Sequence, residues 1–162
     1  MRTETGSEVR GYLLDVNHVS AHFRRESSFM DRLRLVPVDT QWRICSITLG
    51  EIEASHQMST STDPQRRNDY ARFVIDEYAY NTVDITSATR DCYASIIGRI
   101  WQRHPPPRMT TKTERHLIDC GVDVNDVWMV SAAWEHGLVV LTDDNMTCIR
   151  DAVPEVTFEC WI

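Results

Sequence analysis

The stretch VNDVWMVSAAWEHGLVVLTDD, residues 124–144, places a helix, a strand and a pair of acids in direct succession. Apolar side chains recur at spacings of three and four over Val127–Trp134, which is typical of the buried face of an α-helix. We expect Asn125 to cap this helix and Gly137 to follow its last turn, because glycine tolerates the left-handed conformation found there. The apolar run LVVL that comes next predicts a buried strand.

The same alternation of short apolar strands and amphipathic helices extends over the rest of the chain. Strands are expected at 11–15, 43–47, 83–85, 138–141 and 156–160, and helices at 16–25, 27–36, 48–58, 65–78, 87–103, 125–136 and 144–152. This alternation predicts an α/β fold with a parallel sheet. In such sheets ligands bind outside the carboxyl ends of the strands.

Size and composition fit one globular domain. The chain has 162 residues, of which 42% are hydrophobic and 25% charged. That length corresponds to about one domain, and the apolar share is sufficient for a packed core. We expect residues 1–10 to form a flexible N-terminus and residues 11–162 to form a single domain. The sequence HPPPR breaks the helix before it, so 104–120 are expected to form a basic insertion or loop.

Charge and cysteine content exclude several classes of protein. The net charge of −7 excludes a polybasic nucleic-acid binder, so that any nucleic-acid contact must come from a local patch. The five cysteines are widely spaced without a C-x-x-C motif, which argues against a disulfide framework or a zinc knuckle. No signal peptide or membrane span is visible. We therefore expect a cytoplasmic protein without membrane contact.

Acidic residues gather where the predicted strands end. Asp15 ends the first strand, Glu51 lies just after the second, and Asp126 opens the helix before LVVL, which Asp143 and Asp144 follow. Two carboxylates about 5 Å apart repel by about 3 kcal/mol at an effective dielectric constant of 20. Such a cluster either raises its pKa values or binds a hard cation such as Mg²⁺ or Mn²⁺. Carboxylates that hold these metals commonly hydrolyse phosphodiesters.

Each acid also has a purely structural interpretation. Asp15 and Asp126 stand at helix starts, where an acid caps the helix or is favoured by its dipole. The TLGE motif at 48–51 has the form of a capping box, in which the glutamate returns to the backbone of the threonine. Asp143 or Asp144 would equally begin the next helix. The residues alone leave both interpretations open.

Four segments of the chain are shared, in order and spacing, with a known family. They are YLLDVNHVSAHF (12–23), ITLGEIEASH (47–56), VNDVWMVSAAWEHGLVVLTDDNMTCI (124–149) and VTFECWI (156–162). Together they resemble the PIN-domain family, and most closely the toxin ribonucleases of VapBC-type toxin–antitoxin pairs. The resemblance implies a PIN-like three-layer α/β/α fold around a central parallel sheet of four to five strands.

The resemblance also implies a Mg²⁺-dependent endoribonuclease, with Mn²⁺ as the alternative cofactor. The catalytic and metal-binding acids of the family fall on Asp15, Glu51, Asp126 and Asp144. Its supporting polar residues fall on Asn17 and Thr142, with Asp143 beside them. The implied partners are an RNA substrate, an antitoxin protein and a second copy of the chain in a homodimer. The Asp143–Asp144 doublet leaves the fourth acid ambiguous, and a histidine at 18 departs from the aliphatic residue that is more usual there.

A local basic stretch is a candidate for weak RNA contacts. It comprises Arg99, Arg103, Arg108, Lys112 and Arg115. Phosphate contacts from these side chains would offset the negative net charge and would depend steeply on salt. A solvated surface, or a surface that receives an acidic antitoxin segment, is the alternative.

Two other functions compete with that of a nuclease. A catalytically inactive PIN-like module that binds RNA or protein is the main alternative. A receiver domain or aspartyl-phosphate phosphatase is disfavoured, because those families need a late lysine and Lys112 is the only lysine. We expect His18, His22, His56 and His136 to lie on the surface or pack in the core rather than to bind a metal.

Overall fold

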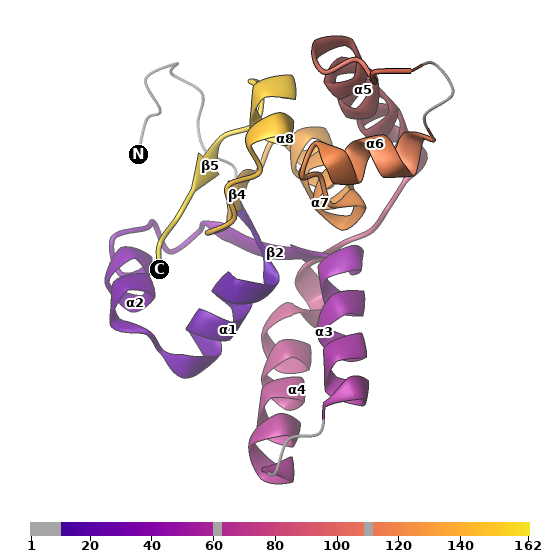
Figure 1. The fold of residues 1–162 in the computed structure, drawn as a ribbon. Coiled ribbons are helices and arrows are strands. Elements are labelled where there is room, and N and C mark those ends of the chain that lie inside the picture. The colour runs from indigo at the N-terminus through magenta and orange to yellow at the C-terminus, as the bar shows by residue number, and fades with distance from the viewer. Residues whose placement is uncertain (1–10, 60–62, 109–111) are drawn as a thin grey trace.

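The computed structural model describes residues 11–59, 63–108 and 112–162. They form a five-stranded parallel sheet with helices on both faces (Figure 1). The strands are β1 (Gly11–Leu14), β2 (Gln41–Cys45), β3 (Thr82–Val83), β4 (Val139–Leu141) and β5 (Phe158–Glu159). Their order is β3-β2-β1-β4-β5, and all four pairings are parallel. This confirms the predicted α/β class and the parallel sheet of four to five strands.

The helices are α1 (Val16–Arg24), α2 (Ser27–Leu33), α3 (Ser46–Met58), α4 (Pro64–Tyr78), α5 (Ser87–Arg103), α6 (Thr113–Asp119), α7 (Val124–His136) and α8 (Thr147–Ala152). A short 3₁₀ helix, η1 (Ala79–Asn81), precedes β3. In Figure 1, α1 to α4 lie on one side of the sheet and α5 to α8 on the other. In the described part of the chain, every helix is too short or too polar to cross a bilayer.

Two buried clusters fill the space between the sheet and its helices. Leu13 belongs to the cluster under α5 and α7, together with Ile96. Its neighbours Tyr12 and Leu14 belong to the cluster under α1, α2 and α4, together with Val19. Successive side chains of a strand point to opposite faces, so β1 contributes to both clusters. The central strand is therefore covered on both sides, and the fold has three layers.

The ends of several elements differ from the expected ones. Helix α3 begins at Ser46, directly after β2, and it has no side-chain cap. Thr48 is thus a buried residue inside the helix, and the structure does not support the interpretation of TLGE as a capping box. Helix α7 begins at Val124 and is capped by Asp123, whose side chain accepts a hydrogen bond from the backbone N–H of Asn125 at 2.8 Å. The prediction of Asn125 as the cap was wrong.

The segment 104–120 contains a helix that the sequence did not predict. Helix α6 has seven residues, which are too few for a periodic apolar pattern to be recognised. It is held by Leu117 and His116, which are both buried. Helix α2 ends at Leu33, three residues before the expected end. Gly137 ends α7 in the left-handed conformation, as predicted.

Candidate active site

A cavity of about 590 Å³ lies beside the segments that follow β1 and β4, between them and helices α3 and α7. The four acids expected from the sequence to converge all line this cavity: Asp15, Glu51, Asp126 and Asp144. A fifth carboxylate, that of Asp123, joins them. Among the described residues no lysine or arginine lines the cavity. We call it the acidic cavity.

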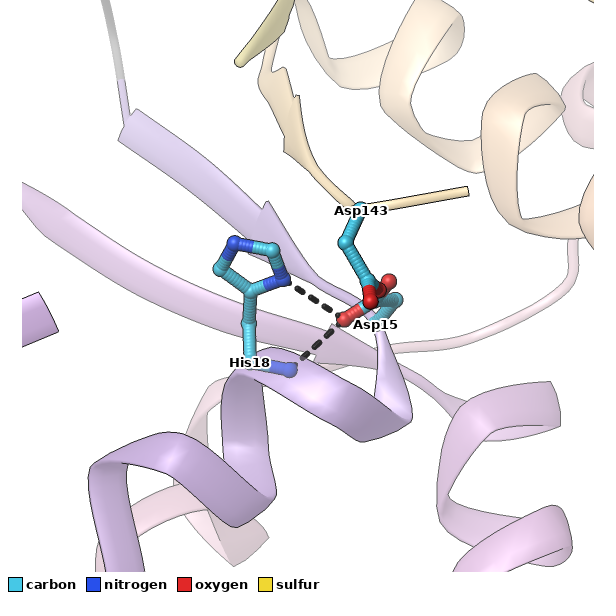
Figure 2. A group of neighbouring side chains, drawn as sticks. All are labelled: Asp15, His18 and Asp143. Carbon is cyan, nitrogen blue, oxygen red and sulfur yellow. Dashed lines mark hydrogen bonds and ion pairs between the residues drawn. The ribbon is translucent and has the colours of Figure 1, made fainter. Parts of the chain in front are cut away.

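Asp15 sits where β1 passes into α1, and its two carboxylate oxygens have different surroundings. Its Oδ1 accepts hydrogen bonds from the backbone N–H of His18 at 2.7 Å and from His18 Nδ1 at 2.9 Å (Figure 2). Its Oδ2 is buried and has no hydrogen-bond partner among the residues that the structure describes. A buried oxygen without a partner is costly unless a donor or a cation occupies the neighbouring space. Asp15 therefore caps a helix with one oxygen and leaves the other available for a ligand.

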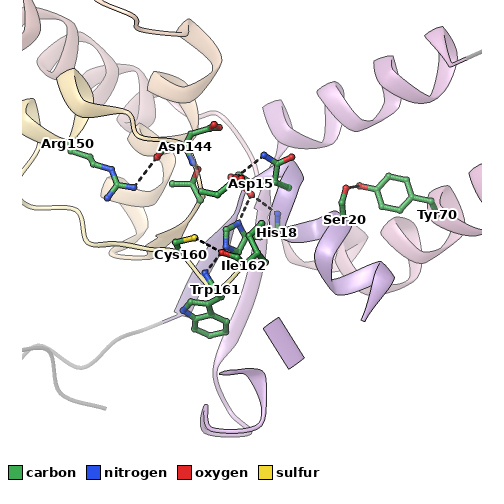
Figure 3. Close-up of polar contacts among 12 residues, drawn as sticks. Asp15, His18, Ser20, Tyr70, Asp144, Arg150, Cys160, Trp161 and Ile162 are labelled. Atoms are coloured by element: carbon green, nitrogen blue, oxygen red, sulfur yellow. Dashed lines mark hydrogen bonds and ion pairs between the residues drawn. The ribbon is translucent and has the colours of Figure 1, made fainter. Parts of the chain in front are cut away.

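His18 is fully buried and links Asp15 to the C-terminal segment. The backbone N–H of Trp161 donates a hydrogen bond to His18 Nε2 at 3.1 Å (Figure 3). Because Nε2 accepts, the proton of the neutral ring resides on Nδ1 and is donated to Asp15. Ligand atoms of Asp15, His18 and Asp143 lie within 4.8 Å of one another. Both ring nitrogens are engaged, however, so His18 is better described as positioning Asp15 than as a metal ligand.

The loop after β4 presents its two acids differently. The buried Thr142 accepts a hydrogen bond through Oγ1 from the backbone N–H of Asp144 at 3.0 Å, and Arg150 donates to the Asp144 carbonyl at 3.2 Å. These bonds fix the loop with Asp144 on the cavity wall. Asp143 is exposed and accepts a hydrogen bond from Asn17 Nδ2 at 2.8 Å. Asp144, and not Asp143, is thus the member of the doublet that lines the acidic cavity.

Glu51 and Asp126 come from the two helices that face each other across the cavity. Asn125 on α7 donates a hydrogen bond from Nδ2 to Glu51 Oε1 on α3, at 2.8 Å. This contact ties the two helices together and orients Glu51. Because α3 begins at Ser46, Glu51 lies in its second turn and takes no part in capping.

The acids of the cavity oppose one another's ionisation. Burial, followed by repulsion from the other four carboxylates of the cavity, raises the pKa of Asp126 to about 7. The pKa of Asp144 is also raised, first by burial and then by Asp143, Asp15 and Asp123. The cavity therefore concentrates negative charge that the protein itself leaves uncompensated.

This donor set fits a hard divalent cation. All the carboxylates are oxygen ligands of the kind that Mg²⁺ and Mn²⁺ prefer. A cation held near Asp15 and Asp126 would coordinate the Oδ2 of Asp15 that no described residue satisfies. It would also offset the repulsion that, after burial, raises the pKa of Asp126.

Solved structures provide the comparison with known proteins. No protein-family model matches the chain, and no curated protein sequence matches it. The DNA-bound VapBC from Salmonella typhimurium is 20% identical, with a TM-score of 0.68 over 94% of this chain and 98% of the other. VapBC2 from Rickettsia felis, bound to a promoter DNA fragment, has a TM-score of 0.65 at 16% identity, over 93% and 98%. VapBC-1 from nontypeable Haemophilus influenzae has a TM-score of 0.62 at 14% identity, over 93% and 97%.

Similarity at these identities is a similarity of fold. The chain has a PIN-like, VapC-type fold. This agrees with the resemblance found in the four sequence segments, and it places the acidic cavity at the carboxyl ends of the central strands of that fold. The PIN-like architecture thus accounts for the convergence of acids that lie up to 129 positions apart, from Asp15 to Asp144.

The basic stretch expected to touch RNA lies away from these acids. None of its members lines the acidic cavity: Arg99, Arg103, Arg108, Lys112 and Arg115. Arg99 forms an ion pair with Glu155 at 2.8 Å and stacks over the ring of Trp134. Arg115 pairs with Asp119 at 3.0 Å. Both arginines therefore have partners within the chain, and RNA contacts by the other three remain a prediction.

Some residues of the site were not selected from the sequence. His18 was expected on the surface or in the core, and its contact with Asp15 was missed. Its position three residues after a helix-capping acid was the available indication, because i and i+3 side chains meet on a helix. Asn125, expected as a cap, instead orients Glu51. No sequence spacing relates Asn125 to Glu51, because the two residues meet only through the packing of α3 on α7.

Proposed function

We propose that this protein is a divalent-metal-dependent endoribonuclease, acting as the toxin of a toxin–antitoxin pair. One observation carries the proposal. Four acids from separate parts of the chain line one cavity that contains no cation of the protein, and one of them offers a buried oxygen without a partner. That arrangement supports Mg²⁺ or Mn²⁺ binding and phosphodiester hydrolysis.

In the proposed mechanism Asp15, Glu51, Asp126 and Asp144 would hold a bound cation. When bound, it lowers the pKa of a water molecule and stabilises the negative charge of the phosphate and of the leaving oxygen. His18 keeps Asp15 in place, so that little reorganisation is needed when the ligand enters. Without a cation, the five carboxylates of the cavity would repel a phosphodiester. Cation binding should therefore precede RNA binding.

The partners are proposed by analogy. Solved neighbours are described as toxin–antitoxin complexes, among them one from Klebsiella pneumoniae and VapBC-5 from Mycobacterium tuberculosis. We propose an antitoxin protein, a homodimer and an RNA substrate for this chain, with the cytoplasm as the place of action. An inactive RNA- or protein-binding module is the second candidate, and the presence of all four acids disfavours it.

The decisive experiment incubates the purified protein with total RNA in Mg²⁺, in Mn²⁺ and in EDTA. We expect cleavage with either metal and none in EDTA. The variants Asp15→Asn and Asp126→Asn should retain the fold, judged by circular dichroism, and lose cleavage. Wild-type rates in both variants would exclude the assignment. Calorimetry that detects neither Mg²⁺ nor Mn²⁺ binding would favour the inactive module.

A further inference from the structure

A second cavity, of about 310 Å³, adjoins the acidic one. It lies among α1, α3 and α4, and Ser55 on α3 lines both cavities. Three arginines and one histidine line it: Arg24, Arg66, Arg67 and His56. Among the described residues no acid lines it, although the chain carries a net charge of −7. We call it the arginine cavity. Two neighbouring cavities therefore have opposite charge.

Two side chains of the arginine cavity have buried polar atoms that find no hydrogen-bond partner within 11–59, 63–108 and 112–162. Arg67 donates from one terminal nitrogen to the carbonyl of Ser59 at 3.2 Å, whereas its Nε is buried and unpaired. The Nδ1 of His56 is likewise buried and unpaired. Arg24 differs, because Glu26 accepts hydrogen bonds from it at 2.6 and 2.9 Å. Arg66 is exposed and forms no ion pair with any described residue.

Unpaired buried donors call for an acceptor. A buried polar atom without a partner is costly, and most such atoms in proteins are satisfied by protein, water or ligand. The planar guanidinium group of arginine matches phosphate oxygens with two parallel hydrogen bonds. Because Arg67 is already held by the Ser59 carbonyl, it loses less freedom on binding an anion. Its Nε, which no described residue satisfies, and the lack of a described acid in the cavity lining favour an anionic ligand.

The position of this cavity relates it to the acidic one. Glu51 and Ser55 are one turn apart on α3, which corresponds to a rise of about 6 Å along the helix axis. A nucleic-acid strand with one phosphate at the acidic cavity would reach the arginine cavity as it follows α3. One side of the arginine cavity is fixed, because the hydroxyls of Ser20 on α1 and Tyr70 on α4, which both line it, are hydrogen-bonded at 3.1 Å (Figure 3).

We propose that the arginine cavity binds a backbone phosphate of single-stranded RNA next to the phosphate that is cleaved, through Arg67 with Arg66 and His56. The proposal rests on the proposed ribonuclease function. A carboxylate of a protein partner would satisfy the same donors. The RNA phosphate is favoured because the two cavities share Ser55 and have opposite charge. An RNA strand that is bound through a cation at one phosphate and through arginine at the next requires such a pair of neighbouring sites.

The test compares Arg67→Gln with Arg72→Gln. Arg72 is exposed on the same helix and lines neither cavity, so that it controls for the loss of one positive charge. Cleavage of a fluorescently labelled single-stranded RNA is followed in Mg²⁺ at several salt concentrations. We expect Arg67→Gln to raise KM about tenfold, with a smaller effect on kcat, because it removes binding energy common to ground and transition states. The slope of log KM against log salt concentration should decrease by about one, because one phosphate contact is lost.

Control variants separate the outcomes. Arg72→Gln should have the KM of the wild type, and Arg66→Gln should raise KM less than Arg67→Gln does. Arg67→Lys should also raise KM less than Arg67→Gln, because lysine keeps the positive charge but lacks the planar geometry of arginine. If the wild type cleaves RNA and Arg67→Gln does so with unchanged KM and salt dependence, the phosphate site is wrong and the ribonuclease function stands. If Arg67→Gln instead weakens only the binding of a protein partner, the cavity serves that partner. If the wild type neither binds nor cleaves RNA, both proposals fall.

Discussion

The imidazole of His18 donates a hydrogen bond to the carboxylate of Asp15 across 2.9 Å, and both side chains are buried. We expect His18→Phe to weaken Mn²⁺ binding, measured by calorimetry, by about tenfold or more, since loss of a residue that orients a metal ligand has effects of that size. At subsaturating concentrations of the metal, the rate of RNA cleavage by this variant should fall mainly because kcat is lower.

His22 provides the matched control for this prediction. It lies one turn further along α1 and forms a hydrogen bond with the Tyr78 hydroxyl at 2.8 Å, away from the acidic cavity. His22→Phe should lower the melting temperature without changing the affinity for Mn²⁺. Equal metal affinities in the wild type and both variants would show that the His18–Asp15 contact serves only stability.

The Asp143–Asp144 doublet allows a test in which neighbouring residues serve as each other's control. Asp144→Asn should reduce cleavage by more than about a hundredfold, because it alters a carboxylate on the cavity wall. Asp143→Asn should retain most of the activity, because Asp143 does not line the acidic cavity and its contact with Asn17 can be kept by an amide oxygen. Single-turnover cleavage rates would distinguish the two. The opposite order would assign Asp143 to the site.

The charge of Asp126 should destabilise the metal-free protein above neutral pH. Its pKa is about 7 in the folded chain, because burial and the neighbouring acids oppose ionisation, and it returns to about 4 on unfolding. At pH values between these two pKa values, Asp126 is protonated in the folded state and ionised in the unfolded state. The contribution to stability therefore falls as pH rises from about 4 through 7.

Asp126→Asn removes this effect. In EDTA, its melting temperature should exceed that of the wild type at about pH 8, and the difference should narrow as pH falls towards about 5. Added Mg²⁺ should raise the melting temperature of the wild type but not that of the variant. A variant that is less stable than the wild type in EDTA at about pH 8 would show that the carboxylate makes a stabilising contact instead.

The sequence predicts the convergence of the acids because the fold class determines it. Once 11–15 and 138–141 are recognised as parallel strands, Asp15 and Asp144 must lie at the same edge of the sheet. Contacts between distant segments are different, since nothing local encodes them. The His18–Trp161 hydrogen bond joins residues 143 positions apart and depends on where the C-terminal segment packs.

Local patterns also failed where two interpretations competed. The TLGE motif matches a capping box, but β2 continues into α3 without a break, so the helix starts earlier and Glu51 is free to face the cavity. The arginine cavity was missed because its members come from three helices and share no spacing. Residues 99–115, by contrast, form a conspicuous basic stretch, and yet Arg99 there is tied to Glu155.

The aromatic cluster around Trp161 should affect the acidic cavity through the C-terminal segment. Trp161 is almost fully buried, and its ring meets Tyr12 edge-on at 4.9 Å and Trp42 at 5.6 Å. We expect Trp161→Ala to lower the free energy of unfolding by about 3–5 kcal/mol, measured by urea denaturation. It should also weaken Mn²⁺ binding, because loosening this segment withdraws the N–H that holds His18.

Trp128→Ala tests whether that second effect is specific. Trp128 is half-buried, stacks on Tyr93 at 4.0 Å and belongs to α7, on the other side of the sheet. Its removal should destabilise the protein by a smaller amount and leave metal affinity unchanged under conditions where both variants are folded. If both variants lose metal affinity in proportion to their loss of stability, the link from Trp161 through His18 to Asp15 is not a separate determinant of the site. A loss confined to Trp161→Ala would instead mark the C-terminal segment as part of the support for the metal ligands.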